Sequence, residues 1–497
     1  MEIHPAFEAF ETRHSAGAPQ VVWTEIIADI ETAVSLMLKL SGAKPLSFML
    51  ESVTGGEVRG RYSVIGMKPD LIWRSRGETA EINRHAAEHA HDFEPAGPTL
   101  ESLRALIAES RIELPEHLPP MAAGLFGYLG YDMIRLVERL PEPNPDPLDL
   151  PDAMMLRPSL VAIVDNIRDQ VTLVTPVWGG GDARAAYDAA VARLGDALES
   201  LNKPAGWGNI TPVADAPLRA LEPVSNTSHG RYLEMVNKAK EYIRAGDIFQ
   251  VVPSQRWSMP LEVSPFALYR ALRRTNPSPY MFFFDLGGFQ IVGASPEILV
   301  RVRGGEVTIR PIAGTRPRGA DPAEDKRLEE ELLADPKERA EHLMLLDLGR
   351  NDVGRVAKIG SVTPTEQFTV EHYSHVMHIV SNVVGDLAPE HDALSAFLAG
   401  MPAGTVSGAP KIRAMEIIDE LESEKRGVYA GGVGYFSAAG EMDTCIALRT
   451  GVVKDGTLYV QAGGGVVYDS DPEAEFEETV NKSKALLHAA SIARNFN

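Results

Sequence analysis

Two pairs of glutamates have the spacing of a site for a hard cation: Glu338 with Glu341, and Glu475 with Glu478. Each pair follows an Asp-Pro dipeptide, which is typical of a helix N-cap and the first helical position. The i, i+3 spacing places the two carboxylates of a pair on one helix face. Two such faces brought together would surround a cation with oxygen ligands, and Mg²⁺ suits this donor set. Acidic residues in a first turn also stabilise a helix dipole, and for one pair alone that is the commoner explanation.

Three glycine-rich segments in the C-terminal half could bind an anion through backbone N–H groups. They are residues 311–319 (PIAGTRPRG), 401–411 (MPAGTVSGAPK) and 461–467 (QAGGGVV). Glycine lets the backbone approach a ligand closely, and a helix that begins after such a loop presents free N–H groups. An ordinary turn or strand bulge is the alternative for each segment. The nucleotide-binding pattern GxxxxGK[ST] is absent.

Three histidines, His372, His375 and His378, follow an HxxHxxH pattern that could bind zinc on a helix. The surrounding residues favour a β-strand, on which His375 points away from the other two. A single histidine acting on a substrate is therefore favoured over a zinc site. The one cysteine, Cys445, lies in a strand-like run, which predicts a small core residue and leaves no disulfide within the chain.

The net charge of −21 over 497 residues argues against nucleic acid as a partner, because nucleic-acid binding needs a broad basic surface. An anionic ligand would need a site that supplies its own positive charge. No apolar run approaches the roughly 20 residues that span a bilayer, and no signal peptide is evident at the N-terminus. These features predict a cytoplasmic protein with no membrane association.

Strand-like and helical segments alternate irregularly, which predicts an α+β fold: a layered sandwich of antiparallel or mixed sheets flanked by helices. Residues 1–20 suggest a loosely ordered lead-in. An N-terminal domain is expected at 20–201, a Pro-, Ser- and Asn-rich linker at 202–228 and a C-terminal domain at 229–490. The expected helices span residues 182–201, 229–245, 264–274, 322–349, 391–399 and 410–421.

Six longer motifs occur in one order along the C-terminal half: PIAGTRPRG (311–319), DLGRNDVG (347–354), GTVSGAPK (404–411), YAGGVGYF (429–436), DTCIALR (443–449) and QAGGGVV (461–467). Together they resemble the motifs of the chorismate-utilising enzymes, and most closely those of the members that form anthranilate. The resemblance covers about residues 20–490. It implies the chorismate-binding enzyme fold, in which both expected domains contribute to one composite sandwich.

The resemblance implies a role for each residue of the site. Mg²⁺ would be held by Glu341 and Glu478, assisted by Glu338 and Glu475, and would bind the ring carboxylate of chorismate. Arg449 matches the residue that binds the enolpyruvyl carboxylate, a task suited to a guanidinium. The other residues implied to line the substrate pocket are Gly314, Thr315, Thr405, Tyr429, Gly463, Gly464, Gly465 and Lys482.

The implied reaction adds ammonia at C2 of chorismate as the C4 hydroxyl leaves, and then expels pyruvate to give anthranilate. Glu297 matches the general acid for the hydroxyl, and His378 the residue linked to removal of the C2 proton. Gln250 stands where isochorismate- and salicylate-forming relatives have a water-activating lysine. Ala313 stands where aminodeoxychorismate-forming relatives often have a lysine nucleophile. Both positions favour anthranilate, and the aminodeoxychorismate of the folate pathway stays the alternative product.

The N-terminal half resembles the part of the family that binds L-tryptophan as a feedback inhibitor. This makes the implied reaction the first committed step of tryptophan biosynthesis. The residues implied to form the inhibitor site are Leu50, Glu51, Ser52, Ser63, Pro279, Tyr280, Met281, Val433 and Tyr435. The chain has no amidotransferase segment with a nucleophilic cysteine. The resemblance therefore implies a separate glutamine amidotransferase subunit that delivers ammonia.

Overall fold

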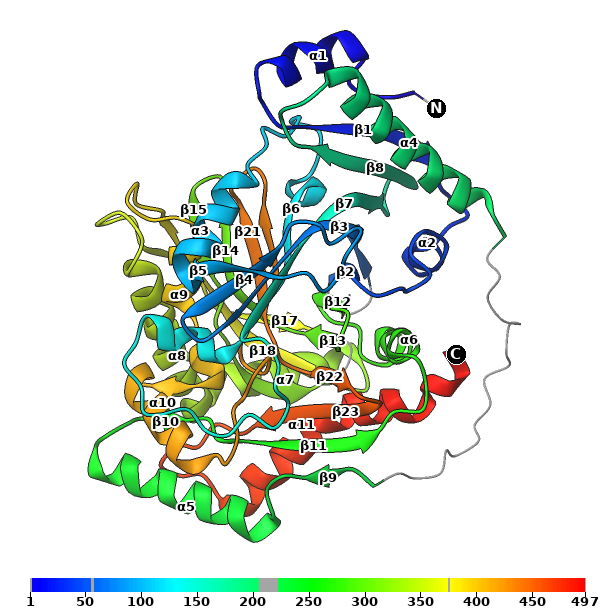
Figure 1. Cartoon of the computed structure of the whole chain (residues 1–497). Coiled ribbons are helices and arrows are strands. Elements are labelled where there is room, and N and C mark those ends of the chain that lie inside the picture. The colour runs from blue at the N-terminus through cyan, green and yellow to red at the C-terminus, as the bar shows by residue number, and fades with distance from the viewer. Residues whose placement is uncertain (1, 55–57, 205–221, 374–375, 497) are drawn as a thin grey trace.

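The computed structural model describes residues 2–54, 58–204, 222–373 and 376–496, which Figure 1 shows as helices and strands. The helices are α1 (Phe7–Ser15), α2 (Ala33–Leu40), α3 (Thr99–Glu109), α4 (Ala183–Asn202), α5 (His229–Ala245), α6 (Pro265–Thr275), α7 (Pro322–Ala334), α8 (Pro336–Gly354), α9 (Ala393–Gly400), α10 (Lys411–Leu421) and α11 (Pro472–Ile492), with 3-10 turns η1 (Pro120–Ala122), η2 (Tyr131–Leu136), η3 (Gly404–Val406) and η4 (Ala493–Phe496). The strands are β1 (Gln20–Ile27), β2 (Ser47–Thr54), β3 (Val58–Arg76), β4 (Thr79–Asn83), β5 (Glu94–Pro98), β6 (Gly124–Leu129), β7 (Ala153–Asp165), β8 (Gln170–Val177), β9 (Val224–Ser225), β10 (Gln250–Val251), β11 (Ser254–Pro260), β12 (Tyr280–Asp285), β13 (Gln290–Ser295), β14 (Ile298–Arg303), β15 (Glu306–Ile309), β16 (Ile312–Pro317), β17 (Thr363–His372), β18 (Val376–Asp386), β19 (Gly408–Ala409), β20 (Gly432–Ser437), β21 (Met442–Ile446), β22 (Thr450–Lys454) and β23 (Thr457–Gly463).

Most strands belong to one continuous sheet with two arms, organised around the long pair β3 and β7. One arm continues through β2, β12, β13, β22, β23 and β11. The other continues through β6, β20, β21, β14, β15 and β18, with β16 and β17 beside β18. Strands β2 and β6 precede the expected linker, and their partners β12 and β20 follow it. The sheet therefore joins the two segments that the sequence divides into domains.

The two arms pack face to face over an aromatic core, as expected for a sandwich. The ring of Phe48 on β2 lies 4.5 Å from that of Phe126 on β6 and 5.2 Å from that of Phe284 on β12. Helices α2, α4, α6 and α11 bury side chains against the outer face of the first arm. Helices α3, α8, α9 and α10 contribute to the hydrophobic cluster on the second. The predicted layered α+β architecture is confirmed, and the strand pairings among the described residues are antiparallel.

Two expectations about local structure are wrong. Residues 1–20 include α1 and the start of β1, and Phe10 is fully buried. Helix α1 has no side-chain N-cap and therefore no start signal in the sequence; its stability comes from packing of Phe7 and Phe10 on Tyr187 of α4. The expected helix at 322–349 is two helices, α7 and α8, divided at Asp335.

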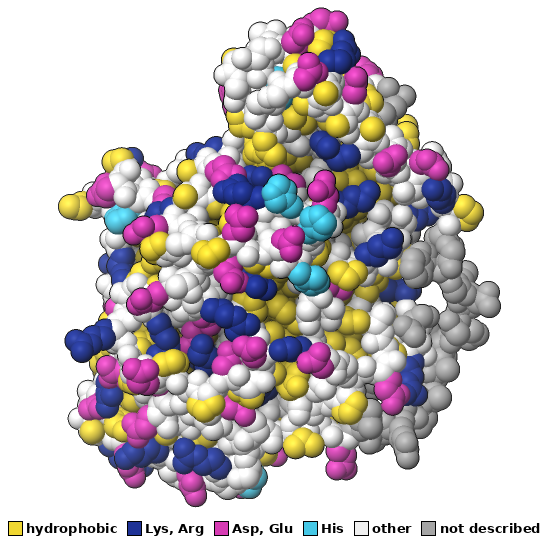
Figure 2. Space-filling model, viewed as in Figure 1, with side chains coloured by type: hydrophobic (Ala, Val, Ile, Leu, Met, Phe, Trp, Pro, Cys, Tyr) yellow, Lys and Arg dark blue, Asp and Glu magenta, His cyan; other side chains and the backbone are white. Residues whose placement is uncertain are grey.

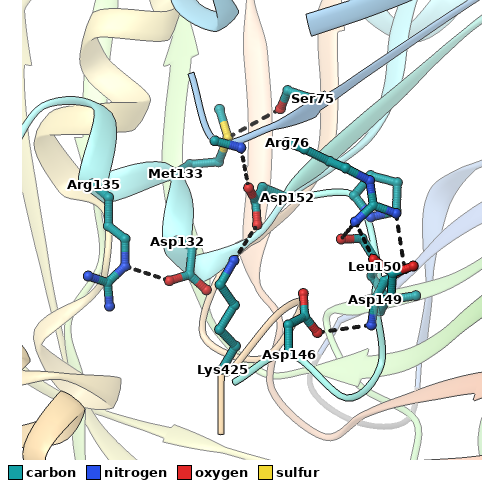
Figure 3. Close-up of polar contacts among 12 residues, drawn as sticks. Ser75, Arg76, Asp132, Met133, Arg135, Asp146, Asp149, Leu150, Asp152 and Lys425 are labelled. Atoms are coloured by element: carbon teal, nitrogen blue, oxygen red, sulfur yellow. Dashed lines mark hydrogen bonds and ion pairs between the residues drawn. The ribbon is translucent and has the colours of Figure 1, made fainter. Parts of the chain in front are cut away.

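Ion pairs tie the N-terminal segment to the C-terminal segment at one edge of the sandwich. Lys425, after α10, lies 3.4 Å from the carboxylate of Asp152, just before β7 (Figure 3). Arg135 of η2 contacts Asp132 in its own turn and both carboxylate oxygens of Asp419 on α10, each at 2.7 Å. These partly buried pairs fix the position of α10 relative to the N-terminal segment.

Acidic and basic side chains are interspersed over the face shown in Figure 2, and hydrophobic side chains gather where the lobe of α1, β1, β8 and α4 meets the body. Within the described ranges, no helix combines the length and the apolar character needed to cross a membrane.

Candidate active site

Both glutamate pairs lie in the first two turns of helices that begin as the sequence predicts. The Asp335 side chain accepts hydrogen bonds from the backbone N–H groups of Lys337 and Glu338 at the start of α8. Asp471 accepts one from Ala474 at the start of α11. In both helices the proline occupies the first turn, where its missing N–H costs nothing. The caps thus fix where each pair of carboxylates projects.

The tertiary structure brings the two pairs within electrostatic range of each other. Burial, followed by the negative charges of Glu338 and Glu478, raises the pKa of Glu341. Burial, with a further contribution from Glu478, raises the pKa of Glu475 to about 7. The charge of Glu478 contributes to the raised pKa of both Glu341 and Glu475, which shows that these carboxylates repel, so a bound cation would stabilise them. This interaction spans helices far apart in sequence.

The carboxylates do not converge on one point in the structure. Arg316 lies 3.2 Å from Glu338, and Lys482 lies 2.7 Å from Glu478. Among the described residues, no three His, Cys, Asp or Glu side chains have metal-binding geometry. One carboxylate oxygen of Glu475, Oε2, is buried and has no hydrogen-bond partner in the part of the chain that the structure describes. A buried anionic oxygen without a donor is costly, and it fits a site that accepts a cation.

Glu297 lies between β13 and β14 with only 6% of its surface exposed. The Thr405 hydroxyl on η3 lies 3.2 Å from each of its carboxyl oxygens. Burial raises the pKa of Glu297 to about 8, against the smaller opposing effects of Thr405 and the Ile312 N–H. The group is therefore a neutral carboxylic acid near pH 7, which can donate a proton.

His378 on β18 is held in one tautomer by a bulge in the neighbouring strand. Its Nδ1 lies 2.9 Å from the Gly314 carbonyl oxygen and 3.1 Å from the Thr315 hydroxyl. A carbonyl only accepts, so Nδ1 carries the hydrogen and Nε2 keeps its lone pair. Burial lowers the pKa of His378 to about 4, so the imidazole is a neutral base.

The bulge depends on glycine. The β16–β18 pairing shifts between Ala313 and Thr315, and Gly314 is the extra residue, with φ +67°. Glycine adopts this left-handed conformation without strain, as in a G1-type bulge. A Cβ at Gly314 would also lie 3.2 Å from Glu338 Oε2. This residue therefore orients the histidine and leaves room for the carboxylate.

Arg449 offers a guanidinium without a partner. It lies between β21 and β22 in the left-handed conformation, with φ +48°, which is strained for a residue other than glycine. The side chain is half-buried, and within the described ranges its guanidinium makes no hydrogen bond or ion pair. Its titratable neighbours include Tyr373 and Glu297. An unpaired guanidinium beside a neutral acid can bind a carboxylate by two parallel hydrogen bonds.

Three glycines at the end of β23, Gly463 to Gly465, form a wall so close to other residues that side chains in their place would collide with them. A Cβ at Gly463 would lie 2.9 Å from the Tyr429 hydroxyl, one at Gly464 3.0 Å from Glu475 Oε2, and one at Gly465 2.7 Å from Gln250 Nε2. Lys482 Nζ donates a 2.9 Å hydrogen bond to the Gly463 carbonyl. The glycines thus let the backbone reach the acidic residues and Gln250.

Gln250 on β10 lies between this wall and the glutamates. Its Nε2 donates a 3.4 Å hydrogen bond to Glu341, and its buried Oε1 has no partner among the described residues. Ala313 on β16 is buried and cannot act as a nucleophile. Neither position carries a basic group.

The histidine triplet does not lie on one element. His372 ends β17 and pairs with Met377, His378 lies on the adjacent strand β18, and His375 lies outside the described residues. The expectation of one strand is therefore wrong for His372 and His378, which a hairpin separates. Cys445 is buried in the core as predicted, and burial raises the pKa of its thiol far above the usual range.

The residues implied to bind tryptophan divide between the helix-covered side of the first arm and the core between the two arms. Glu51 and Met281 point to the helix-covered side, where they and Ser52 line a cavity of about 470 Å³. Leu50, Tyr280, Val433 and Tyr435 pack in the core between the arms. Pro279 is half-buried.

Glu51 is saturated by partners that the sequence did not indicate. Its carboxylate accepts hydrogen bonds from Arg273 at 2.6 and 2.9 Å, from Tyr269 at 2.5 Å and from Ser63 at 3.3 Å. It therefore joins β2 to α6.

Two motifs carry a structural contact that sequence reasoning missed. Lys411, the last residue of GTVSGAPK, and Asp352 of DLGRNDVG form a buried 2.8 Å ion pair. The pair joins the start of α10 to α8. Only the presence of a lysine in one motif and an aspartate in the other could have suggested it.

The fold brings a neutral acid, a neutral base, a guanidinium and clustered carboxylates into electrostatic range of one another, which is typical of an enzyme active site. A model of chorismate binding enzymes matches residues 65–488, and the chain therefore belongs to that family. Two relatives with high identity to this chain are named anthranilate synthase component 1. The protein of Cereibacter sphaeroides is 66% identical over 495 residues, covering 99% of this chain and 98% of that protein. The protein of Pseudomonas putida is 49% identical and covers 94% of both.

Solved structures agree with the fold. Anthranilate synthase component I from Streptococcus pneumoniae superposes with a TM-score of 0.75 at 38% identity, covering 86% of this chain and 92% of that one. The menaquinone-specific isochorismate synthase of Escherichia coli superposes with a TM-score of 0.69 at 19% identity, covering 98% of both chains. The second similarity shows the fold alone.

Proposed function

We propose that this chain converts chorismate and ammonia to anthranilate and pyruvate. The observation that carries the proposal is the pairing of a protonated Glu297, with a pKa of about 8, and a neutral His378, with a pKa of about 4, in one buried site. The reaction needs an acid for a poor leaving group and a base for a carbon acid, and these are the two states held at neutral pH.

The first step adds ammonia at C2 while the C4 hydroxyl takes a proton from Glu297 and leaves as water; the ammonium group formed at C2 then loses one proton, which restores the acid form of Glu297. The second step transfers the C2 proton to a base and breaks the bond between the ring and the enolpyruvyl oxygen, which makes the ring aromatic; the released enolpyruvate takes up a proton to become pyruvate. We assign the base role to Nε2 of His378, because Nδ1 is engaged with Gly314. Thr405 orients the acid.

Substrate anions need positive charge in a chain of net charge −21. The unpaired guanidinium of Arg449 supports a role in binding the enolpyruvyl carboxylate. Mg²⁺ fits the acidic cluster, because it contains a buried oxygen of Glu475 with no hydrogen-bond partner among the described residues, and because the charge of Glu478 raises the pKa of Glu341. We propose that Glu341 and Glu478 hold the ion, assisted by Glu338 and Glu475. Bound there, it would supply positive charge for the ring carboxylate.

The remaining pocket residues support the same substrate. Gly314 and Thr315 fix His378, while Gly463, Gly464, Gly465, Tyr429 and Lys482 form the wall beside the acidic cluster. Gln250 and Ala313 provide neither a base for water nor a nucleophile for the ring. We infer that ammonia is preferred to water.

We propose that ammonia comes from a separate glutamine amidotransferase subunit. Amidotransfer from glutamine needs a reactive thiolate, and the one thiol of this chain is buried with a raised pKa. We also propose that L-tryptophan inhibits the enzyme and that the activity is cytoplasmic. The cavity lined by Ser52 and Met281 supports an inhibitor site, although Glu51 there is committed to Arg273. If saturating tryptophan left chorismate turnover unchanged, the inhibitor proposal would be abandoned.

The deciding experiment incubates the purified chain with chorismate, Mg²⁺ and ammonium at mildly alkaline pH. Anthranilate is expected, detected by its fluorescence, together with an equal amount of pyruvate. With glutamine in place of ammonium, turnover is expected only after the second subunit is added. A product that keeps its enolpyruvyl group would favour the aminodeoxychorismate alternative. A product formed with water and not with ammonia would overturn the assignment.

A further inference from the structure

A carboxylate lies directly across the strand pair from the proposed base. Glu371 on β17 and His378 on β18 are register partners. Side chains of such partners share one face of the sheet, with Cβ atoms about 4.5–5.5 Å apart. A carboxylate free to turn toward an imidazole at this distance would stabilise its protonated form. A free carboxylate at this position would therefore raise the pKa of His378, which must stay neutral to act as a base.

Both oxygens of Glu371 are held by other groups. Arg310 forms an ion pair with Oε1, and the Tyr373 hydroxyl donates a 2.9 Å hydrogen bond to Oε2. Burial, followed by the charge of Glu371, raises the pKa of Tyr373, so its hydroxyl stays a donor. The carboxylate is thus directed at Arg310 and Tyr373.

Tyr373 also contacts the histidine itself. The two rings are 5.4 Å apart at 64°, an edge-to-face arrangement. Tyr373 is anchored by a 2.8 Å hydrogen bond from its N–H to the Val376 carbonyl. Tyr373 therefore contacts both Glu371 and His378. It also acts electrostatically on Arg449.

We propose that Arg310, Glu371 and Tyr373 form a positioning unit that turns a carboxylate away from His378 and packs an aromatic ring against the imidazole. The role of His378 as base rests on the proposed function, but the effect of the unit on its protonation does not. The other groups that act on the imidazole are the Gly314 carbonyl and Thr315 on β16, and Arg449 and Lys482, whose positive charges oppose protonation. The negative charge of Glu371 favours protonation of His378.

The test is an NMR titration of His378 in the substrate-free protein labelled at histidine, with His378→Gln to assign its signal among the 13 histidines. Tyr373→Phe removes only the hydroxyl that holds Glu371. We expect the His378 pKa to rise by about one unit, the low end of the effect of a nearby opposite charge. The double variant Tyr373→Phe/Glu371→Gln should return it to the wild-type value or below, because it also removes the Glu371 charge that acts on His378 in the wild type.

A rise in Tyr373→Phe that persists in the double variant, or no rise at all, would overturn the proposal. Arg310→Gln frees the other oxygen and should move the pKa in the same direction, so it replaces Tyr373→Phe if that variant does not fold. The acid limb of anthranilate formation should move with the titration. A shifted titration in a chain that makes no anthranilate would leave the positioning unit standing and remove the proposed function.

Discussion

The Thr405 hydroxyl lies 3.2 Å from both carboxyl oxygens of Glu297, inside a pocket where Glu297 is 6% exposed. Water is largely excluded, and Arg449 is near but not in contact. Burial therefore favours the neutral form of Glu297. The hydrogen bond from Thr405 lowers the pKa of Glu297, but by less than burial raises it.

Glu297→Gln should lower turnover with ammonia by roughly 10²–10⁴-fold, the usual contribution of a general acid. The side chain keeps its shape, so chorismate binding should change little. Steady-state anthranilate fluorescence gives kcat and KM separately. A large rise in KM at unchanged kcat would contradict the acid role.

The stability of Glu297→Gln relative to wild type should depend on pH. The pKa of Glu297 is raised from 4.5 to about 8 in the folded chain. Between these values the folded state binds the extra proton, so this group's contribution to stability falls as pH rises and levels off above about 8. In urea unfolding, the free energy of unfolding of the variant relative to wild type should be higher at about pH 8 than at about pH 5. An equal difference at both pH values would argue that the carboxyl ionises normally.

Anthranilate formation by the wild type should follow a bell-shaped pH profile. The pKa of His378 is lowered to about 4 and that of Glu297 raised to about 8. Activity should therefore rise as the histidine loses its proton and fall as the glutamate loses its own. The profile of kcat/KM measures both limbs. A basic limb that survives in Glu297→Gln would belong to another group.

Arg449→Gln should reduce kcat/KM for chorismate by about 10- to 100-fold, the range for a lost charge-assisted hydrogen bond to a carboxylate. Arg449→Lys keeps the charge without the fork and should recover only part of the loss. Both variants keep the strained backbone position, so they form a matched pair. Equal activity of the lysine variant and wild type would mean that charge alone suffices.

Glu341→Gln should weaken Mg²⁺ binding and raise the Mg²⁺ concentration needed for activity by at least tenfold. Glu477→Gln is the control, because Glu477 is an exposed carboxylate of α11 beside Glu478. Calorimetric titration of Mg²⁺ in the presence of chorismate measures the affinity directly. If both variants bound the ion equally well, Glu341 would not be a ligand.

Local sequence determined the elements that carry the acidic residues. An Asp-Pro dipeptide sets the start of a helix through one side-chain cap and one fixed φ, and both α8 and α11 begin where these signals lie. The order of the long motifs along the chain likewise indicated the family. The α+β class followed from the mixture of strand-like and helical sequence patterns. Helix α1 could not be predicted in this way, because its stability depends on Tyr187, which is distant in sequence.

Only the tertiary structure decided the chemical state of the site. The protonated state of Glu297 and the neutral state of His378 come from burial, which depends on packing of strands from both halves of the chain. The tautomer of His378 comes from a one-residue bulge at Gly314, and the partners of Glu51 and Glu371 come from strand register and helix docking. A sequence names residue types, but pKa values and hydrogen-bond partners depend on distances that long-range packing sets.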